Sequence, residues 1–291
     1  MNRLLDPKVD FVFKRIFGSE ENKDVLLAFL NETFKASQGE LLKEITLVNP
    51  YIDKNALDDK LSILDIRAVT EDRKQINIEI QLFNHHNIEK RTLYYWSKLY
   101  EEQLGEGQNY RYLKKTITIN IINFRYLPGE QYHNIFHLRE DRTGILLTDD
   151  LEIHFMELPK LETGAFDVGT GLVKWLLFLK GLDKSKWEEI AMDQPKLRKA
   201  MTTLEFLSQD REARRLYEMR QKALLDERWK IEGAREEGKA EGKAEGKVEG
   251  KVEGKIEVAR NLLQMGMEIS SIVKATGLTE DEIRKLAQPD H

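Results

Sequence analysis

The stretch LSILDIRAVTEDRKQINIEIQLF, residues 61 to 83, decides the fold of this chain. Two apolar runs flank a polar turn, and each run carries one carboxylate, Asp65 in the first run and Glu79 in the second. Acidic residues are depleted in β-strands, and a buried carboxylate is unfavourable unless it is paired, hydrogen-bonded or bound to a metal. The two carboxylates therefore need a common explanation.

Strand alternation predicts how the two runs pair. In a hairpin with an odd-length loop centred on Asp72, residue 65 lies opposite 79, 66 opposite 78 and 64 opposite 80. The apolar side chains then share one face, and Asp65 and Arg67 share the other face with Asn77, Glu79 and Gln81. An even-length loop would place each carboxylate among the isoleucines of the partner strand, so the hydrophobic pattern favours the register that brings the carboxylates together.

Two interpretations of this acidic pair remain open. Like charges held side by side repel, and a divalent cation between Asp65 and Glu79 would remove that repulsion. A hard cation such as Mg²⁺, or Mn²⁺, prefers such oxygen ligands. The alternative is a hairpin with one solvated face, on which Asp65 pairs with Arg67 or Arg73. This stretch alone slightly favours the solvated hairpin.

Composition limits the class of protein. The chain has 291 residues, a formal net charge of −5 and no cysteine. Disulfides and thiolate metal sites are thereby excluded, and a cytoplasmic location is expected. The longest apolar run, GLVKWLLFLKG, is too short to span a bilayer, and the N-terminus lacks the apolar core of a signal peptide, so no membrane partner is expected. The charge argues against non-specific coating of nucleic acid, although local lysines and arginines could still guide a phosphodiester to a site.

The order of predicted elements indicates a mixed α/β domain over residues 1 to 165. We expect helices at 7–17, 19–34 and 87–104, strands at 41–52, 114–124 and 151–161, and the hairpin at 61–83. The nearly continuous apolar run at 114–124 predicts a central strand.

Three further parts follow. Residues 166 to 232 read as an all-α segment, with one long charged helix from Pro195 to Glu232. Residues 233 to 257 contain a Gly/Glu/Lys repeat with a period of four. Each glycine costs a helix about 1 kcal/mol relative to alanine, so the repeat is marginally helical and predicts a linker or a long helix. A spacer is favoured over a glycine stripe that pairs helices between protomers.

Residues 258 to 291 form a small helix-turn-helix-like unit, in which Thr279 and Glu282 make a capping box. The helix that should meet DNA begins Thr279-Glu280-Asp281-Glu282, and its carboxylates fit phosphate poorly. Packing, or a homo-oligomer formed through these C-terminal helices, is therefore at least as well supported as DNA reading.

Five segments in order carry a family resemblance: DFVFKRIFG at 10–18, LDIRA at 64–68, INIEIQ at 76–81, KRTLYYWSKLYEEQL at 90–104 and LEIHFMELPKL at 151–161. Together they resemble the Rpn-type branch of the PD-(D/E)XK nuclease superfamily, whose members are described as recombination-promoting nucleases or transposase-like proteins. The resemblance covers residues 6 to 161. It implies a restriction-endonuclease-like mixed sheet flanked by helices.

The resemblance also implies site residues. Asp65 and Glu79 would bind Mg²⁺, or another divalent cation such as Mn²⁺, for hydrolysis of a DNA phosphodiester. Gln81 stands where the family has lysine and can only hydrogen-bond and orient. Lys14 or Arg91 would then supply the missing positive charge.

Three other positions are assigned with alternatives. Asp10 matches the acidic residue that the superfamily often contributes from its first helix, and it would serve equally well as a helix cap. Arg91 and Lys98 share a face of helix 87–104 and are predicted to bind substrate. For Arg91, an ion pair with Glu89 or Glu101 is the alternative.

Three functions follow. The first is a metal-dependent DNA endonuclease acting in recombination or on mobile DNA. The second is a catalytically weak or inactive oligomeric DNA-binding or regulatory protein that retains the nuclease fold, because Gln81 replaces lysine. The third is a DNA-binding regulator that uses the terminal helices.

Overall fold

The computed structural model describes residues 3–35, 41–49, 51–52, 62–63, 65–84, 87–162, 169–181 and 183–286. The chain divides into two compact units, Met1–Leu224 and Leu225–His291. The first contains the sheet, and the second contains the C-terminal helices.

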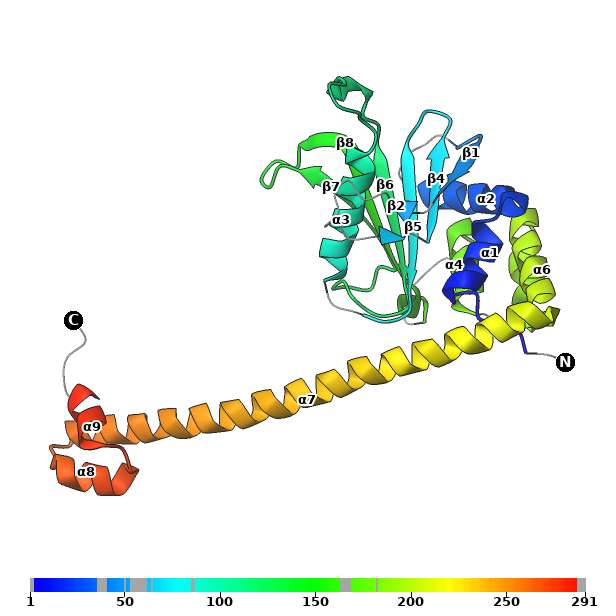
Figure 1. Cartoon of the computed structure of the whole chain (residues 1–291). Helices are drawn as coiled ribbons and strands as arrows, with labels where there is room; N and C mark the ends of the chain where they lie inside the picture. The colour runs from blue at the N-terminus through cyan, green and yellow to red at the C-terminus, as the bar shows by residue number, and fades with distance from the viewer. Residues whose placement is uncertain are drawn as a thin grey trace. The chain divides into compact units, whose positions relative to one another are not determined.

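A six-stranded sheet of order β1-β4-β5-β6-β8-β7 forms the centre of the first unit (Figure 1). Its strands are β1 Ile45–Val48, β4 Ile66–Thr70, β5 Gln75–Gln81, β6 Thr116–Ile122, β7 His133–Arg139 and β8 Leu146–Glu157. Strands β5, β6 and β8 run parallel to one another, and the other neighbours pair antiparallel. The short strands β2 Tyr51–Ile52 and β3 Ser62–Ile63 pair separately. The mixed α/β fold and the central position of β6, buried along its whole length, are as predicted from the sequence.

The hairpin register is also confirmed. Ile66 pairs with Ile78, and Arg67 pairs with Asn77. Ile66, Ala68, Ile76, Ile78 and Ile80 are buried on one face, as the alternation required. Leu64, the remaining apolar residue of this prediction, lies outside the described residues.

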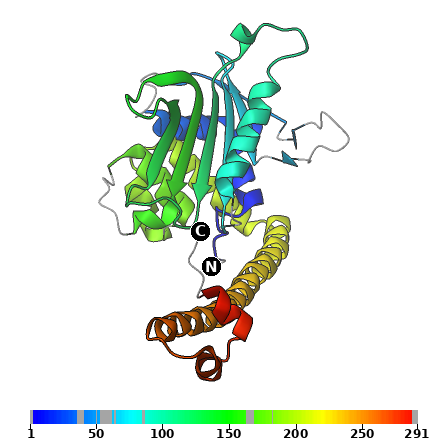
Figure 2. The same ribbon diagram turned by 90° about the vertical axis from the view of Figure 1, so that its left-hand side faces the viewer.

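Helices cover both faces of the sheet. On the apolar face, α1 Asp10–Phe17, α2 Lys23–Phe34 and α4 Gly171–Lys180 share the hydrophobic core of the sheet, and α6 Pro195–Gln209 packs against α1 and α2. Helix α3 Ile88–Glu101 lies on the opposite face (Figures 1 and 2). Phe17 of α1 joins the helices of the core, because its ring lies 5.6 Å from that of Phe29 in α2 and 5.8 Å from that of Trp175 in α4. One hydrophobic core therefore continues past residue 165 into the helical segment.

The structure differs from the predictions at the edge of the sheet and in the helix expected over 195–232. The edge strand β7 was not expected, and its hairpin partner β8 begins at Leu146, five residues before the predicted start at residue 151. The single helix expected over 195–232 is interrupted at Asp210, whose backbone is extended and whose carboxylate accepts a hydrogen bond from Ala213 N at 2.7 Å. Asp210 thus ends α6 and begins α7 Arg211–Gln264.

The C-terminal unit contains the rest of α7 together with α8 Ile269–Thr276 and α9 Glu280–Leu286. The residues of the Gly/Glu/Lys repeat lie within α7. The predicted capping box is present, because Glu282 Oε2 accepts from Thr279 N at 2.7 Å and Thr279 Oγ1 accepts from Glu282 N at 3.3 Å. Gly266 and Gly277 adopt positive φ in the two turns, a conformation that glycine favours. No helix in the described part of the chain is long and apolar enough to cross a bilayer.

Candidate metal and phosphate site

Asp65 and Glu79 lie side by side where β4 begins and β5 approaches its end. The backbone N of Asp65 donates to Glu79 Oε1 at 3.3 Å, and the backbone N of Ile80 donates to Asp65 Oδ2 at 2.9 Å. Each carboxylate is therefore held by the backbone of the other strand. The hairpin register brings the two acidic groups together without help from the loops.

Glu79 is the more deeply buried of the two acids. Its side chain is 3% exposed, whereas that of Asp65 is 15% exposed. Burial and the neighbouring Asp65 raise the pKa of Glu79 to about 7, although Arg91 opposes the change. The site therefore favours neutralisation of one carboxylate, which either a proton or a divalent cation can provide. This donor set of two carboxylates fits a hard cation.

Two cations contact the acidic pair. Lys14 Nζ, from α1, lies 3.2 Å from Asp65 Oδ1. Arg91 Nη2, from the first turn of α3, lies 2.9 Å from Glu79 Oε2, and its guanidinium carbon lies 5.5 Å from the centre of the Tyr95 ring. Asp65 is thus paired with Lys14 rather than with Arg67 or Arg73, and Arg91 is paired with Glu79 rather than with Glu89 or Glu101. The partners suggested from the sequence were local in the chain, whereas the actual partners come from other elements.

Gln81 is buried at the end of β5, two residues after Glu79 and on the same face of the sheet. Its backbone carbonyl accepts a hydrogen bond from Asn123 N at 2.9 Å. By strand alternation, its side chain belongs to the same face of β5 as that of Glu79.

Asp10 and Lys98 are engaged elsewhere in the structure. The Asp10 carboxylate accepts from Arg220 of α7, with Nε at 2.9 Å from Oδ1. The Lys98 ammonium lies 3.8 Å from Glu101 Oε2 on the same helix. Among the contacts between described residues, none joins Asp10 or Lys98 to Asp65 or Glu79.

A second polar group lies on β7 and β8, and of its acids Glu152 is buried whereas Asp149 is exposed. The ligand atoms of His137, Asp149 and Glu152 lie within 4.8 Å of one another. Lys115 Nζ lies 2.7 Å from Glu152 and 2.9 Å from Asp149, so one ammonium contacts both acids. His154, fully buried, contacts Glu152 Oε1 at 2.7 Å.

Sequence reasoning missed this group, although one signal for it was present. Glu152 and His154 alternate on the strand that the sequence predicts over residues 151–161. His154 Nδ1 lies 2.8 Å from His133 Nε2. Burial, and to a smaller extent the neighbouring His154, lower the pKa of His133 to about 3. A carboxylate only accepts hydrogen bonds, so His154 donates to Glu152 from Nε2 and accepts from His133 at Nδ1.

A buried ion pair anchors the loop that follows β6. Lys160 Nζ lies 2.7 Å from Glu157 Oε1, and both side chains are at most 1% exposed. Glu157 Oε2 accepts from Tyr126 N at 2.7 Å, and Lys160 donates to Leu127 O at 3.0 Å. The spacing of three residues between Glu157 and Lys160 was the available sequence signal.

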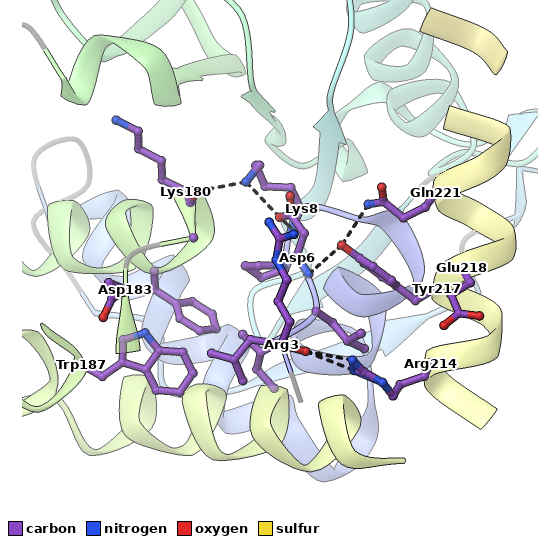
Figure 3. A pocket seen from close by; sticks show the side chains of 16 residues that line it. Arg3, Asp6, Lys8, Lys180, Asp183, Trp187, Arg214, Tyr217, Glu218 and Gln221 are labelled. Carbon is purple, nitrogen blue, oxygen red and sulfur yellow. Dashed lines mark hydrogen bonds and ion pairs between the residues drawn. The ribbon is translucent and has the colours of Figure 1, made fainter. Parts of the chain in front are cut away.

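A cavity of about 760 Å³ lies between the N-terminal segment, α4, α6 and the first turns of α7 (Figure 3). Its polar groups bond to one another: Lys8 Nζ donates to Lys180 O at 3.1 Å, Arg214 to Arg3 O at 3.1 Å, and Asp6 N to Tyr217 Oη at 3.3 Å. These contacts fasten the N-terminal segment to the helices, and the cavity lies apart from the acidic pair.

A mixed sheet flanked by helices, with an acidic pair on one hairpin, is the architecture of PD-(D/E)XK nucleases. The model of the family described as "PD-(D/E)XK nuclease family transposase" matches residues 7–234, which is most of the chain. The chain therefore belongs to this family. Residues 252–288 match the model described as "Rpn/YhgA-like nuclease family, C-terminal HTH domain", which makes the protein an Rpn-type member. Comparisons with curated proteins and with solved structures found no match.

Proposed function

We propose that the protein is a metal-dependent DNA endonuclease that hydrolyses phosphodiester bonds in recombination or on mobile DNA. The observation that carries this proposal is the adjacent pair Asp65 and Glu79, held by the backbone of the hairpin in a chain of the nuclease family. A cytoplasmic location and DNA as the partner belong to the same proposal.

Each residue of the site has a role in this proposal. Asp65 and Glu79 hold the divalent cation, Mg²⁺ or Mn²⁺. When bound, that cation supplies an activated water and neutralises charge on the attacked phosphate. Gln81 orients the reacting groups by hydrogen bonds, and Lys14 and Arg91 supply the positive charge that Gln81 lacks.

Asp10 and Lys98 do not contact the acidic pair, so their proposed roles need separate explanations. Asp10 can assist the site only if the Arg220 guanidinium leaves its carboxylate. Lys98 lies two helical turns after Arg91 on α3, and we propose that it contacts the DNA backbone beyond the reacting phosphate.

Loss of cutting on removal of one carboxylate tests the function. Purified wild-type protein with Mg²⁺ or Mn²⁺ is expected to nick plasmid DNA, and Asp65→Ala is expected to reduce nicking to background. Asp72→Asn, which neutralises an acid at the hairpin turn, is the matched control and should cut like wild type. Equal cutting by wild type and Asp65→Ala would remove the proposal.

A second candidate function is supported by Gln81 and by the match of the C-terminal unit to a helix-turn-helix model. In this alternative the chain is an oligomeric DNA-binding or regulatory protein with little or no catalysis. It predicts that wild type binds duplex DNA without cutting it in any divalent cation, and that Asp65→Ala binds equally well. Titration of duplex DNA with wild type and Asp65→Ala under identical salt separates the two functions.

A further inference from the structure

Each carboxylate of the site has a partly exposed cation as its partner. The Lys14 side chain is 36% exposed and that of Arg91 is 39% exposed, whereas their acidic partners are 15% and 3% exposed. The acids are therefore set into the protein, and the cations lie on the solvent side of them. A group that arrives from solvent meets Lys14 and Arg91 first.

Arg91 has unused donor capacity. Its Nη2 donates to Glu79, while its Nε is buried and has no hydrogen-bond partner among the described residues. The guanidinium also lies over the Tyr95 ring, one helical turn further along α3, which provides a second support for the cation. Arg91 can thus leave Glu79 without leaving its aromatic support.

A divalent cation and these two side chains compete for the same oxygen atoms. Lys14 contacts Asp65 Oδ1, and Arg91 contacts Glu79 Oε2. A cation bound by both carboxylates takes over these contacts, and two positive side chains beside a divalent cation repel it and each other. Phosphate oxygens relieve this repulsion because they accept hydrogen bonds from arginine and lysine.

We propose that Lys14 and Arg91 are exchangeable counter-ions: they neutralise Asp65 and Glu79 in the free protein, and on binding of a divalent cation they transfer to the phosphates of DNA. The proposal rests on the proposed metal-dependent function. It adds that cation binding and DNA binding strengthen each other by the same factor, because the two events share one set of ion pairs.

Calorimetry with Mn²⁺ tests the exchange in the absence of DNA. Arg91→Gln and Lys14→Gln each remove a competitor for the carboxylates, so Mn²⁺ is expected to bind these variants more tightly than wild type, by about fivefold or more. Lys90→Gln is the matched control, because Lys90 is an exposed residue next to Arg91 on the same helix. Its Mn²⁺ affinity should equal that of wild type.

Fluorescence anisotropy of a short labelled duplex gives the second measurement. In Mn²⁺, Arg91→Gln and Lys14→Gln are expected to bind the duplex about fivefold or more weakly than wild type, although they bind Mn²⁺ more tightly. A general structural defect would weaken both affinities together. Opposite changes in the two affinities are therefore specific to the exchange.

The outcomes separate this proposal from the nuclease activity. Unchanged or weaker Mn²⁺ binding by both variants, in a wild type that cuts DNA, would overturn the exchange and leave the nuclease intact. Tighter Mn²⁺ binding with weaker DNA binding, in a wild type that does not cut, would support the exchange and count against catalysis. Wild type that binds no Mn²⁺ at all would overturn the exchange.

Discussion

Glu79 differs from an ordinary glutamate because the fold holds it out of water beside a second acid. Burial and Asp65 raise its pKa to about 7, so folding favours its protonated form. The folded state then binds more protons than the unfolded state between the usual glutamate pKa and pH 7. This residue therefore lowers the stability of the protein as the pH rises through that interval.

Replacement of Glu79 by glutamine should remove this pH dependence. We expect Glu79→Gln to gain stability relative to wild type on going from pH 5 to pH 8, by more than about 1 kcal/mol. Denaturant unfolding of both proteins at the two pH values measures the difference. The exposed Glu71→Gln should show no such change. A stability difference between wild type and Glu79→Gln that stays constant with pH would contradict a raised pKa.

Strand alternation predicts the acidic pair, whereas the family resemblance alone suggested Lys14 or Arg91 as its cation, and nothing in the sequence predicted which acid each of them contacts. Alternation of polar and apolar residues depends only on neighbours along a strand, so it placed Asp65, Glu79 and Gln81 on one face. The contact of Lys14 with Asp65 depends on how α1 packs against the hairpin, and the contact of Arg91 with Glu79 depends on how α3 crosses the sheet. Such packing leaves no local pattern in the sequence.

At the scale of elements, α3 covers an unusually polar face of the sheet. Asn77 and Asn120 are both buried beneath this helix. Asn120 accepts from Thr92 Oγ1 at 3.1 Å and donates to His154 O at 3.2 Å. Neither amide atom of Asn77 has a hydrogen-bond partner among the described residues. Of these two asparagines on neighbouring strands, the side chain of Asn120 is hydrogen-bonded and that of Asn77 has no partner among the described residues.

This contrast predicts opposite effects of the same substitution. Asn77→Val should leave the free energy of unfolding unchanged or raise it by up to about 1 kcal/mol, because an unpartnered buried amide is unfavourable. Asn120→Val should lower it by about 1–3 kcal/mol, because Thr92 and the carbonyl of His154 lose their partner. Denaturant unfolding of the two variants checks this. Equal destabilisation by both would indicate that Asn77 is satisfied, for example by ordered water.

The edge strand β7 shows where element prediction fails. Its sequence, HNIFHLR, has no regular alternation, and Phe136 and Leu138 are exposed although apolar. Its partner β8 was predicted only where burial gives a strong apolar pattern. Edge strands have fewer neighbours, so packing constrains their sequence less than it constrains β6.

At the scale of the whole molecule, the family match over residues 7–234 includes the helices of the segment from Gly171 onward. Those helices complete the core on the apolar face of the sheet, so the sheet and the segment fold together. The sequence indicated separate parts because their secondary structures differ. Burial, which unites them, depends on which apolar faces meet, and that information is not local.

The helical repeat gives the last prediction. Apart from the adjacent residues and the backbone of α7 itself, a Cβ added at Gly242, Gly246 or Gly250 meets no atom within 4 Å in the part of the chain that the structure describes. Replacing these three glycines by alanine should therefore stabilise α7 by about 1 kcal/mol each through helix propensity alone, if the repeat is a spacer. The thermal transition followed by circular dichroism should rise, and the mass in sedimentation equilibrium should equal that of wild type. Ala240→Gly with Ala244→Gly is the matched control and should lower the transition. If the glycines instead allow close helix pairing between protomers, the added methyl groups separate the helices, and the alanine variant loses the oligomer that wild type forms.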